Sequence, residues 1–308
     1  MPYSGNTFDN ECLAKNSARR TKSMFKELFR SAKLFIKRIL KKLRNKPTNS
    51  KKLMFLHMPK AGGTSLRNAL SIALGGRPQT IDIGQLRKSL RSLSSFETED
   101  RGFYSASGNY QEFLLTYYLN HNMSFISGHF TLSNKTLDMF GGKYVFITCL
   151  RDPVERFISQ YLYDKLLELK SNGQANLEIT DDAIESELQH YLQSWRAWFV
   201  SHIYIWMLGG HKYTHELNST LAKTTAKENI ARFDLVGFTD ALPDFTDRLG
   251  KLIHRKLKIK VDNSTKKKSL DNAIDLASYR ALFTPEVKEQ IRELCKDDYE
   301  IYHYAKKM

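Results

Sequence analysis

The chain has 308 residues, of which 41% are hydrophobic, and it carries 48 lysine and arginine residues against 33 aspartate and glutamate residues. This length and apolar content are sufficient for one α/β domain with a sizeable buried core, alone or with an appendage. The three cysteines are too few for a disulfide framework, so a reducing compartment fits and we expect a cytoplasmic protein.

The positive charge is concentrated at the N-terminus. Residues 1–52 contain 15 lysines and arginines against 3 acidic residues, which leaves 33 against 30 for residues 53–308. Because the body of the chain is nearly neutral, the charge says little about the acceptor and much about the N-terminal arm. We expect no nucleic-acid partner. The sequence therefore predicts a basic arm, residues 1–52, followed by one domain, residues 53–308.

Within this arm, apolar residues recur at helical spacing between lysines and arginines over residues 24–43. The pattern predicts a basic amphipathic helix, which can lie on an anionic membrane surface and hold the protein there peripherally. It cannot span a bilayer, because charges interrupt every apolar run well short of ~20 residues. A helix packed on its own domain, or partial disorder, is the alternative.

The domain begins with a short apolar run, 53–56, that leads into the loop Pro-Lys-Ala-Gly-Gly-Thr-Ser at 59–65. The run is typical of a buried strand, and a helical pattern follows the loop. The two glycines allow the backbone to approach an anion closely, and Thr64 and Ser65 are suitable caps for the helix. Unpaired N–H groups at a helix start attract negative charge, so this segment predicts a phosphate-binding loop.

This loop differs from the ATP-binding loop of P-loop enzymes. A Walker A loop places a lysine directly after its last glycine, whereas Lys60 precedes both glycines, and the pattern GxxxxGK[ST] occurs nowhere in the chain. An ordinary P-loop ATPase is therefore disfavoured. A plain strand-to-helix turn is the alternative interpretation of this loop taken alone.

Helical periodicity follows at 64–75, 84–94 and 110–120, and a strand is expected at 124–128. A second informative segment begins with the buried strand pattern 144–150. It continues through Arg151, Asp152 and Pro153 into a helix, with Asp152 as the expected N-cap. Arg151 then lies at the carboxyl end of a strand, and Ser159 lies about two turns along the helix. In open α/β sheets, ligands bind beyond the carboxyl ends of strands, so both segments can form one anion-binding site.

The remaining chain alternates between helical and strand patterns. We expect helical structure over 181–208, a strand at 234–238, a helix at 241–256, an edge strand at 258–261 and a closing helix at 285–305. The overall prediction is an α/β fold with a P-loop-like parallel sheet flanked by helices. Trp195, Trp198 and Trp206 have near-helical spacing and are expected mainly in the core, although one or two of them, with Arg196, could line an acceptor groove.

At these two motifs the chain resembles the sulfotransferases that use 3′-phosphoadenosine 5′-phosphosulfate (PAPS). The loop at 59–65 resembles their 5′-phosphosulfate loop, and the segment R-D-P-x-x-R-x-x-S-x-Y at 151–161 resembles their 3′-phosphate segment. The resemblance extends over most of residues 53–305 and is closest to the Golgi heparan sulfate 2-O-sulfotransferases and their bacterial relatives. It implies the sulfotransferase fold and transfer of a sulfuryl group from PAPS to a carbohydrate or glycoconjugate, without a metal.

The resemblance also implies roles for individual residues. Ser127-Gly128-His129 stands where relatives have a Gly-His element, so His129 corresponds to the catalytic base, and Lys60 is implied both in catalysis and in binding. The implied cofactor-binding residues are Lys60, Ala61, Gly62, Gly63, Thr64, Ser65, Arg151, Ser159, Ser264 and Lys267. Ala61 departs from the threonine of many relatives, and the lysine run around Ser264 and Lys267 could equally be a solvated surface.

Two other functions remain open from the sequence. One is a kinase-like phosphotransferase of related architecture, which is disfavoured because no GK[ST] sequence and no evident Mg²⁺-binding carboxylate after a strand are present. The other is a non-catalytic, membrane-surface nucleotide-binding module that keeps the basic arm without turnover. Binding of a 3′-phosphorylated nucleotide in preference to ATP would separate a sulfotransferase from a kinase.

Overall fold

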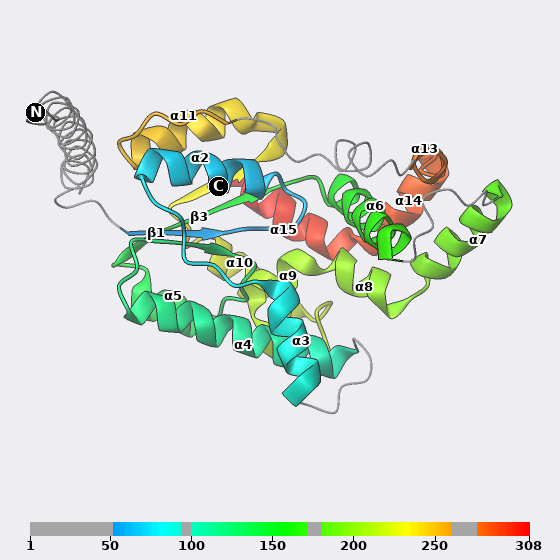
Figure 1. Ribbon diagram of the computed structural model, residues 1–308, viewed down its shortest axis with the longest axis horizontal. Coiled ribbons are helices and arrows are strands. Elements are labelled where there is room, and N and C mark those ends of the chain that lie inside the picture. Colours follow the sequence, from blue (N-terminus) through cyan, green and yellow to red (C-terminus); the bar gives the residue numbers. More distant parts are fainter. Residues whose placement is uncertain (1–51, 94–99, 172–179, 260–275) are drawn as a thin grey trace, which may run out of the picture. The chain divides into compact units, whose positions relative to one another are not determined.

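A four-stranded parallel sheet forms the centre of the fold in the computed structural model, which describes residues 52–93, 100–171, 180–259 and 276–308 (Figure 1). The strands are β1 (Lys52–Leu56), β2 (Phe125–Gly128), β3 (Tyr144–Leu150) and β4 (Leu235–Phe238). They lie in the order β2-β1-β3-β4, and every neighbouring pair is parallel. The expected α/β fold with a parallel sheet flanked by helices is confirmed.

Helices make up most of the remaining described chain. Before β3 these are α2 (Gly63–Leu74), α3 (Ile83–Leu93), α4 (Arg101–Asn120) and α5 (Asn134–Phe140). Between β3 and β4 they are α6 (Pro153–Ser171), α7 (Asp181–Leu192), α8 (Trp195–Ser201), α9 (Ile203–Gly209), the 3₁₀ turn η1 (His211–Tyr213) and α10 (Thr220–Ile230). After β4 come η2 (Thr239–Ala241), α11 (Leu242–Leu252), α13 (Ala277–Ala281), α14 (Pro285–Leu294) and α15 (Lys296–Lys307).

Alternate residues of each strand face two separate hydrophobic cores. In β1, Leu53 and Phe55 join the core formed with α2 and α11, whereas Met54 and Leu56 join the larger core on the opposite face. Figure 1 shows α2 and α11 on one side of the sheet, with α4, α5 and α10 on the other. Both faces are covered, and for this reason the strands are near-continuous apolar runs.

The strand register brings the ends of three strands to the same edge of the sheet. Leu56 of β1 aligns with Gly128 of β2 and with Thr148 of β3. The backbone N–H of His57 then donates to Gly128 O at 2.9 Å, which continues the pairing beyond the end of β1. The segments that leave β1, β2 and β3 therefore start close together, where ligands bind in open α/β sheets.

Several helices differ from the expectations. Helix α4 starts at Arg101 rather than at 110, because the Asp100 side chain caps it by accepting the N–H of Phe103 at 2.9 Å. Helices α5 and α10 were not expected. The first has only seven residues, and the second contains Thr-Thr and Glu-Asn pairs that obscure its apolar stripe.

Two expectations near the C-terminus are wrong. Lys258 and Ile259 do not form a strand, and the rest of the expected edge strand lies outside the described residues. The closing helix at 285–305 is interrupted at Cys295, which ends α14 and precedes α15. The buried Cys295 side chain faces Pro153 O at 3.8 Å, so the interruption lies where these helices meet the start of α6. The proposed arm lies outside the described residues, apart from Lys52 in β1.

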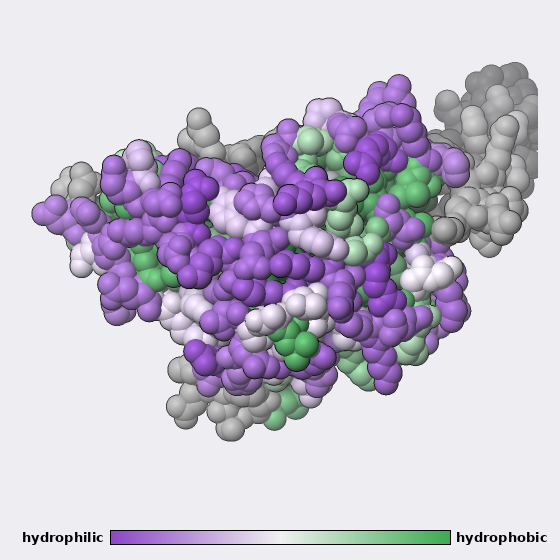
Figure 2. Space-filling model, turned by 180° about the vertical axis from the view of Figure 1, so that it is seen from behind, coloured by the Kyte–Doolittle hydropathy of each residue, from purple (hydrophilic) through white to green (hydrophobic). Residues whose placement is uncertain are grey.

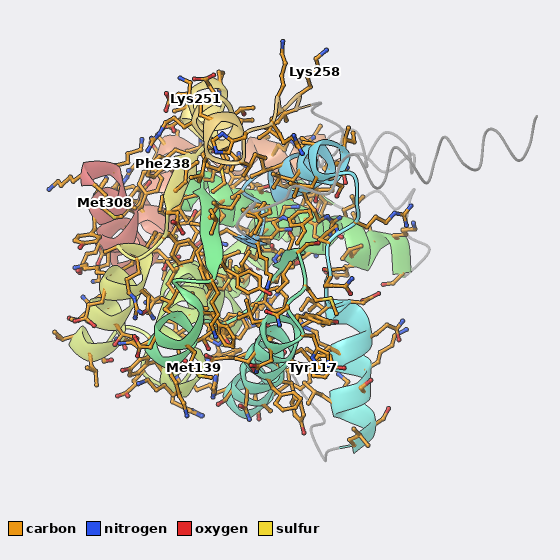
Figure 3. All side chains as sticks on the ribbon, turned by 90° about the vertical axis from the view of Figure 1, so that its left-hand side faces the viewer. Tyr117, Met139, Phe238, Lys251, Lys258 and Met308 are labelled. Carbon is orange, nitrogen blue, oxygen red and sulfur yellow. The ribbon has the colours of Figure 1, made fainter. Side chains whose placement is uncertain are left out.

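The surface of the described part is largely polar. Figure 2 shows a mainly hydrophilic face with small, separated apolar patches. Tyr117 on α4 and Met139 on α5 are exceptions, at 47% and 49% exposure, and Figure 3 shows both at the same end of the molecule. The helices in the described ranges are all too short or too polar to cross a bilayer.

Burial on α2 gives a direct test of how the sheet is covered. Leu70 is fully buried against the sheet, whereas Ile72, two residues further along the same helix, is 82% exposed. Leu70→Ala should lower the free energy of unfolding by about 2–5 kcal/mol, because it removes apolar contacts and leaves a cavity. Ile72→Ala is the matched control and should change it by no more than about 0.5 kcal/mol. Equal losses in urea unfolding would contradict this packing.

Candidate functional site

A cleft of about 920 Å³ lies where the segments after β1, β2 and β3 meet. The residues expected at the site that line this cleft are Lys60, Gly62, Gly63, Thr64, Ser65, His129, Arg151 and Ser159. Ala61 lies beneath the loop at 1% exposure and does not line the cleft. Ser264 and Lys267 lie outside the described residues. The two sequence motifs therefore meet in one cavity, as expected.

The loop after β1 has an unusual backbone. Lys60 and Gly62 have φ angles of 62° and 69°, in the left-handed region, which is uncommon for a lysine. Helix α2 begins directly after Gly62, and its first intrahelical bond runs from the N–H of Leu66 to Gly62 O. Residues 63–65 lie in the first turn, where helix geometry leaves N–H groups without intrahelical acceptors.

The expectation that Thr64 and Ser65 cap α2 is wrong. Gly62 occupies the N-cap position, and no side chain of the described residues caps it. The start of the helix is therefore satisfied neither by a Ser or Thr side chain nor by an acidic residue in its first turn. An uncapped helix start that faces a cleft is a suitable environment for an anion.

The Lys60 side chain reaches across to α6. Its Nζ lies 3.9 Å from the centre of the Tyr163 ring, and both residues line the cleft. A cation over an aromatic face is attracted by the ring quadrupole, which fixes the position of the ammonium group. Tyr163 was not singled out from the sequence. It lies one helical turn after Ser159, so helical spacing from the second motif could have identified it.

Arg151, Glu155 and Ser159 line a second part of the cleft, here called the Arg151 corner, and Arg151 also contacts the loop. Its Nη1 donates to Lys60 O at 3.4 Å, and its Nη2 pairs with Glu155 at 3.3 Å. The hydroxyl of Tyr204 accepts the backbone N–H of Arg151 and donates to its carbonyl, which fixes the backbone at this point. The expected N-cap of α6 is confirmed, because Asp152 accepts the N–H of Glu155 at 3.1 Å.

His129 follows β2, on the other side of β1 from Arg151, and lines the cleft beside the loop. Its Nδ1 donates to His57 O at 2.5 Å, which leaves Nε2 as a proton acceptor. Burial lowers the pKa of His129 from its ordinary value to about 4, against the hydrogen bond to His57 O, and nearby positive charges add to the lowering. The imidazole is therefore neutral at pH 7 in the nucleotide-free protein.

The other end of the cleft combines aromatic and charged side chains. Trp206 and Arg196 line it, whereas Trp195 and Trp198 do not, and an acceptor groove at this place stays a prediction. Arg196 pairs with Asp164 at 3.1 Å and donates to the Tyr104 hydroxyl. Gln111 is 2% exposed, and its Oε1 has no hydrogen-bond partner within the described part of the chain.

Other cleft residues were given no role from the sequence. Arg156 belongs to the second motif, and the structure shows that it is fully buried and donates to Val200 O, so it joins α6 to α8. The cationic side chains that also line the cleft are Arg87, Arg280 and Lys288. They come from α3, α13 and α14, which carry no motif, so only the folded arrangement reveals them.

The whole-chain comparison agrees with this geometry. The sequence matches the family model described as Sulfotransferase family over residues 43–305, which includes both motifs. The chain belongs to the sulfotransferase family. Membership of the sulfotransferase family supports an enzyme that transfers sulfate and counts against the kinase-like alternative. Comparison with curated proteins gives no match.

The environment of His129 predicts its titration. In the nucleotide-free protein the ring should protonate only as the pH falls through about 4, well below the ordinary value of 6.5. Bound 3′-phosphoadenosine 5′-phosphate (3′,5′-ADP), which is PAPS without its sulfuryl group, should raise this pKa, because nearby phosphate charges favour the protonated ring. Nuclear magnetic resonance of the histidine rings, with His129→Asn to assign the signal, measures both values. A pKa of 6.5 or higher without nucleotide would contradict the described burial.

Proposed function

We propose that the protein transfers a sulfuryl group from PAPS to a hydroxyl of a carbohydrate or glycoconjugate. The observation that carries this proposal is the meeting, in one cleft, of the uncapped start of α2, the Arg151 corner and the neutral His129 ring. PAPS would supply an activated sulfuryl group whose bond to the 5′-phosphate breaks as the acceptor oxygen bonds to sulfur. The described residues suit each part of that exchange.

The loop fits the 5′ end of the donor. The N–H groups of residues 63–65 and the Lys60 ammonium offer positive charge where the leaving phosphate gains negative charge. A preorganised donor of this kind contributes about 3–4 kcal/mol to the transition state. These groups are already fixed by the helix start and by Tyr163, so little reorganisation is required.

The Arg151 corner fits the 3′-phosphate. The guanidinium group of Arg151 can bind two phosphate oxygens at once. Ser159 of α6, which lines the same cleft, adds a hydroxyl. Lys288 lies 4.0 Å from Glu155, the partner of Arg151, and adds charge at this corner. Since ATP lacks a 3′-phosphate, this corner would distinguish PAPS from ATP.

His129 fits the role of general base. The bond from its Nδ1 to His57 O directs the unprotonated Nε2 to other partners, and the neutral ring can take the proton from an acceptor hydroxyl. Its pKa of about 4 would make it a weak base in the nucleotide-free protein. The charges of the bound nucleotide raise basicity, so His129 becomes effective when the donor is bound.

We place the sugar acceptor at the far end of the cleft. Arg87 and Arg196 line this end and could contact an acidic sugar. The rings of Tyr104 and Trp206 are 1% and 4% exposed, so they support this wall from within rather than offer a free aromatic face. We propose a place for the chain near the heparan sulfate 2-O-sulfotransferase branch. Attachment to an anionic membrane through residues 24–43 remains a prediction, because those residues lie outside the described ranges. A cytoplasmic location, expected from the low cysteine count, also remains a prediction.

The first test of this function is nucleotide selectivity. The protein should bind 3′,5′-ADP more tightly than ADP or ATP, and Arg151→Ala should weaken binding of 3′,5′-ADP by about 2–5 kcal/mol, because it removes one partner of a charge pair. Isothermal calorimetry measures both. Arg232→Ala is the matched control, because Arg232 pairs with Asp138 outside the cleft. Equal affinity with and without the 3′-phosphate would rule out PAPS as the donor.

The second test separates the base from the binding site. His129→Ala should lower kcat by about 10²–10⁴, the usual range for loss of a general base, with little change in affinity for 3′,5′-ADP. Radiolabelled PAPS with a panel of glycosaminoglycan acceptors gives the turnover. Lys60→Ala should lose both turnover and nucleotide affinity. The exposed His215 provides the control substitution, and full activity of His129→Ala would assign the base to another residue.

A further inference from the structure

His57 is a buried residue at the end of β1 that the proposed reaction does not use directly. Its side chain is 6% exposed, and its ring stacks on that of Phe55 with centres 5.6 Å apart and planes inclined by 12°. Its Nδ1 has no hydrogen-bond partner in the described ranges, so the position of the ring depends on its packing against neighbouring residues. Burial also keeps the pKa of His57 well below its ordinary value, with nearby His129 and Arg67 acting in the same direction.

One contact of the ring is with the nucleotide loop. A Cβ atom placed on Gly63 would lie 2.0 Å from Cδ2 and 2.2 Å from Nε2 of His57. Gly63 is in the first turn of α2 and has no positive φ, so its backbone does not require glycine. The glycine is required because the imidazole of His57 fills the space where a side chain would begin.

The other contact of the ring is with the proposed base. The rings of His57 and His129 have centres 4.5 Å apart, and the carbonyl of His57 accepts the Nδ1 proton of His129. The same residue therefore contacts the start of α2 through one side of its ring and His129 through its ring and its carbonyl.

We infer that His57 is a positioning residue, whose ring holds the start of α2 and the ring of His129 at a fixed separation. This inference rests on the proposed function, because it assigns the loop to the nucleotide and His129 to the acceptor proton. His57 itself lines the cleft, but this role acts through Gly63 and His129 and requires no contact of the His57 ring with either ligand. The ring keeps the loop N–H groups and His129 Nε2 at a fixed distance from each other. The N–H groups can then stabilise the charge on the leaving phosphate while His129 accepts the proton of the acceptor hydroxyl.

A double-mutant cycle tests the contact with the loop. Gly63→Ala should weaken binding of 3′,5′-ADP about tenfold, because the new methyl group displaces the helix start or the ring. In the His57→Ala, Gly63→Ala double variant the methyl group has space, so part of that affinity should return. Calorimetry gives the dissociation constants, and thermal melting shows that each variant is folded. Gly142→Ala is the control, because nothing lies within 4 Å of a Cβ placed there.

A second measurement reports on the base without any acceptor. In the parent protein, nitrogen chemical shifts of His129 should show one tautomer, protonated at Nδ1. His57→Ala should give a mixture, because the ring loses its support, and His57→Phe, which keeps a flat ring, should restore most of the single form. If His57→Ala does not fold, His57→Asn takes its place in both experiments.

The outcomes separate this inference from the proposed function. Failure of the parent protein to bind 3′,5′-ADP would remove the proposed function, and the tautomer of His129 would then decide the inference alone. The positioning role is overturned if 3′,5′-ADP binds but the losses of affinity in the two single variants simply add in the double variant. It is also overturned if His129 keeps one tautomer in His57→Ala. A recovered affinity together with a mixed tautomer supports it.

Discussion

The site depends on a helix that starts without a side-chain cap at the end of a central strand. Gly62, in the left-handed region, turns the chain from β1 into α2, and the first N–H groups of the helix then face the cleft. Such a start is unfavourable unless an anion or water satisfies it. The strand order determines which residues lie beside this helix start, because β2 and β3 are the neighbours of β1 in the sheet. His129 comes directly after β2, and Arg151 comes directly after β3.

Electrostatics joins the parts of this site into one unit. Lys60, Arg87 and Arg151 line the same cavity. The charges of Lys60, Arg87 and nearby Arg67 add to the burial that keeps His129 neutral. Where positive charges gather without a ligand, each raises the cost of protonating a neighbouring histidine. An anionic nucleotide reverses this relationship, because it neutralises the cations and favours a proton on the ring. The proposed donor would therefore prepare the base for the acceptor.

Much of the fold could be predicted because local sequence and global structure agree. The buried strands have continuous apolar runs, and the loop at 59–65 and the segment at 151–161 each combine a strand end, charged residues and a helix start. Apart from Ala61, the cofactor-binding residues predicted from these two motifs line one cavity. Their roles as binding or catalytic groups remain proposals.

Other parts could not be predicted, for physical reasons. Helix α10 owes its position to the packing of small residues such as Ala222 and Ala226, which give a weak apolar stripe. Arg87, Arg280 and Lys288 reach the cleft from helices that lie outside both motifs, and no local pattern marks them. For Gly63, the sequence indicated close approach to an anion, and the structure adds a second reason for glycine that the sequence did not reveal, because the His57 ring lies where a side chain would begin.

A crystal structure of the complex with 3′,5′-ADP tests the central claim most directly. The account predicts the 5′-phosphate within hydrogen-bond distance of the N–H groups of residues 63–65. The 3′-phosphate should contact Arg151 and Ser159, and His129 Nε2 should face the open side of the 5′-phosphate. A nucleotide bound outside the cleft, or one whose 3′-phosphate faces solvent while ATP binds in the same way, would contradict it.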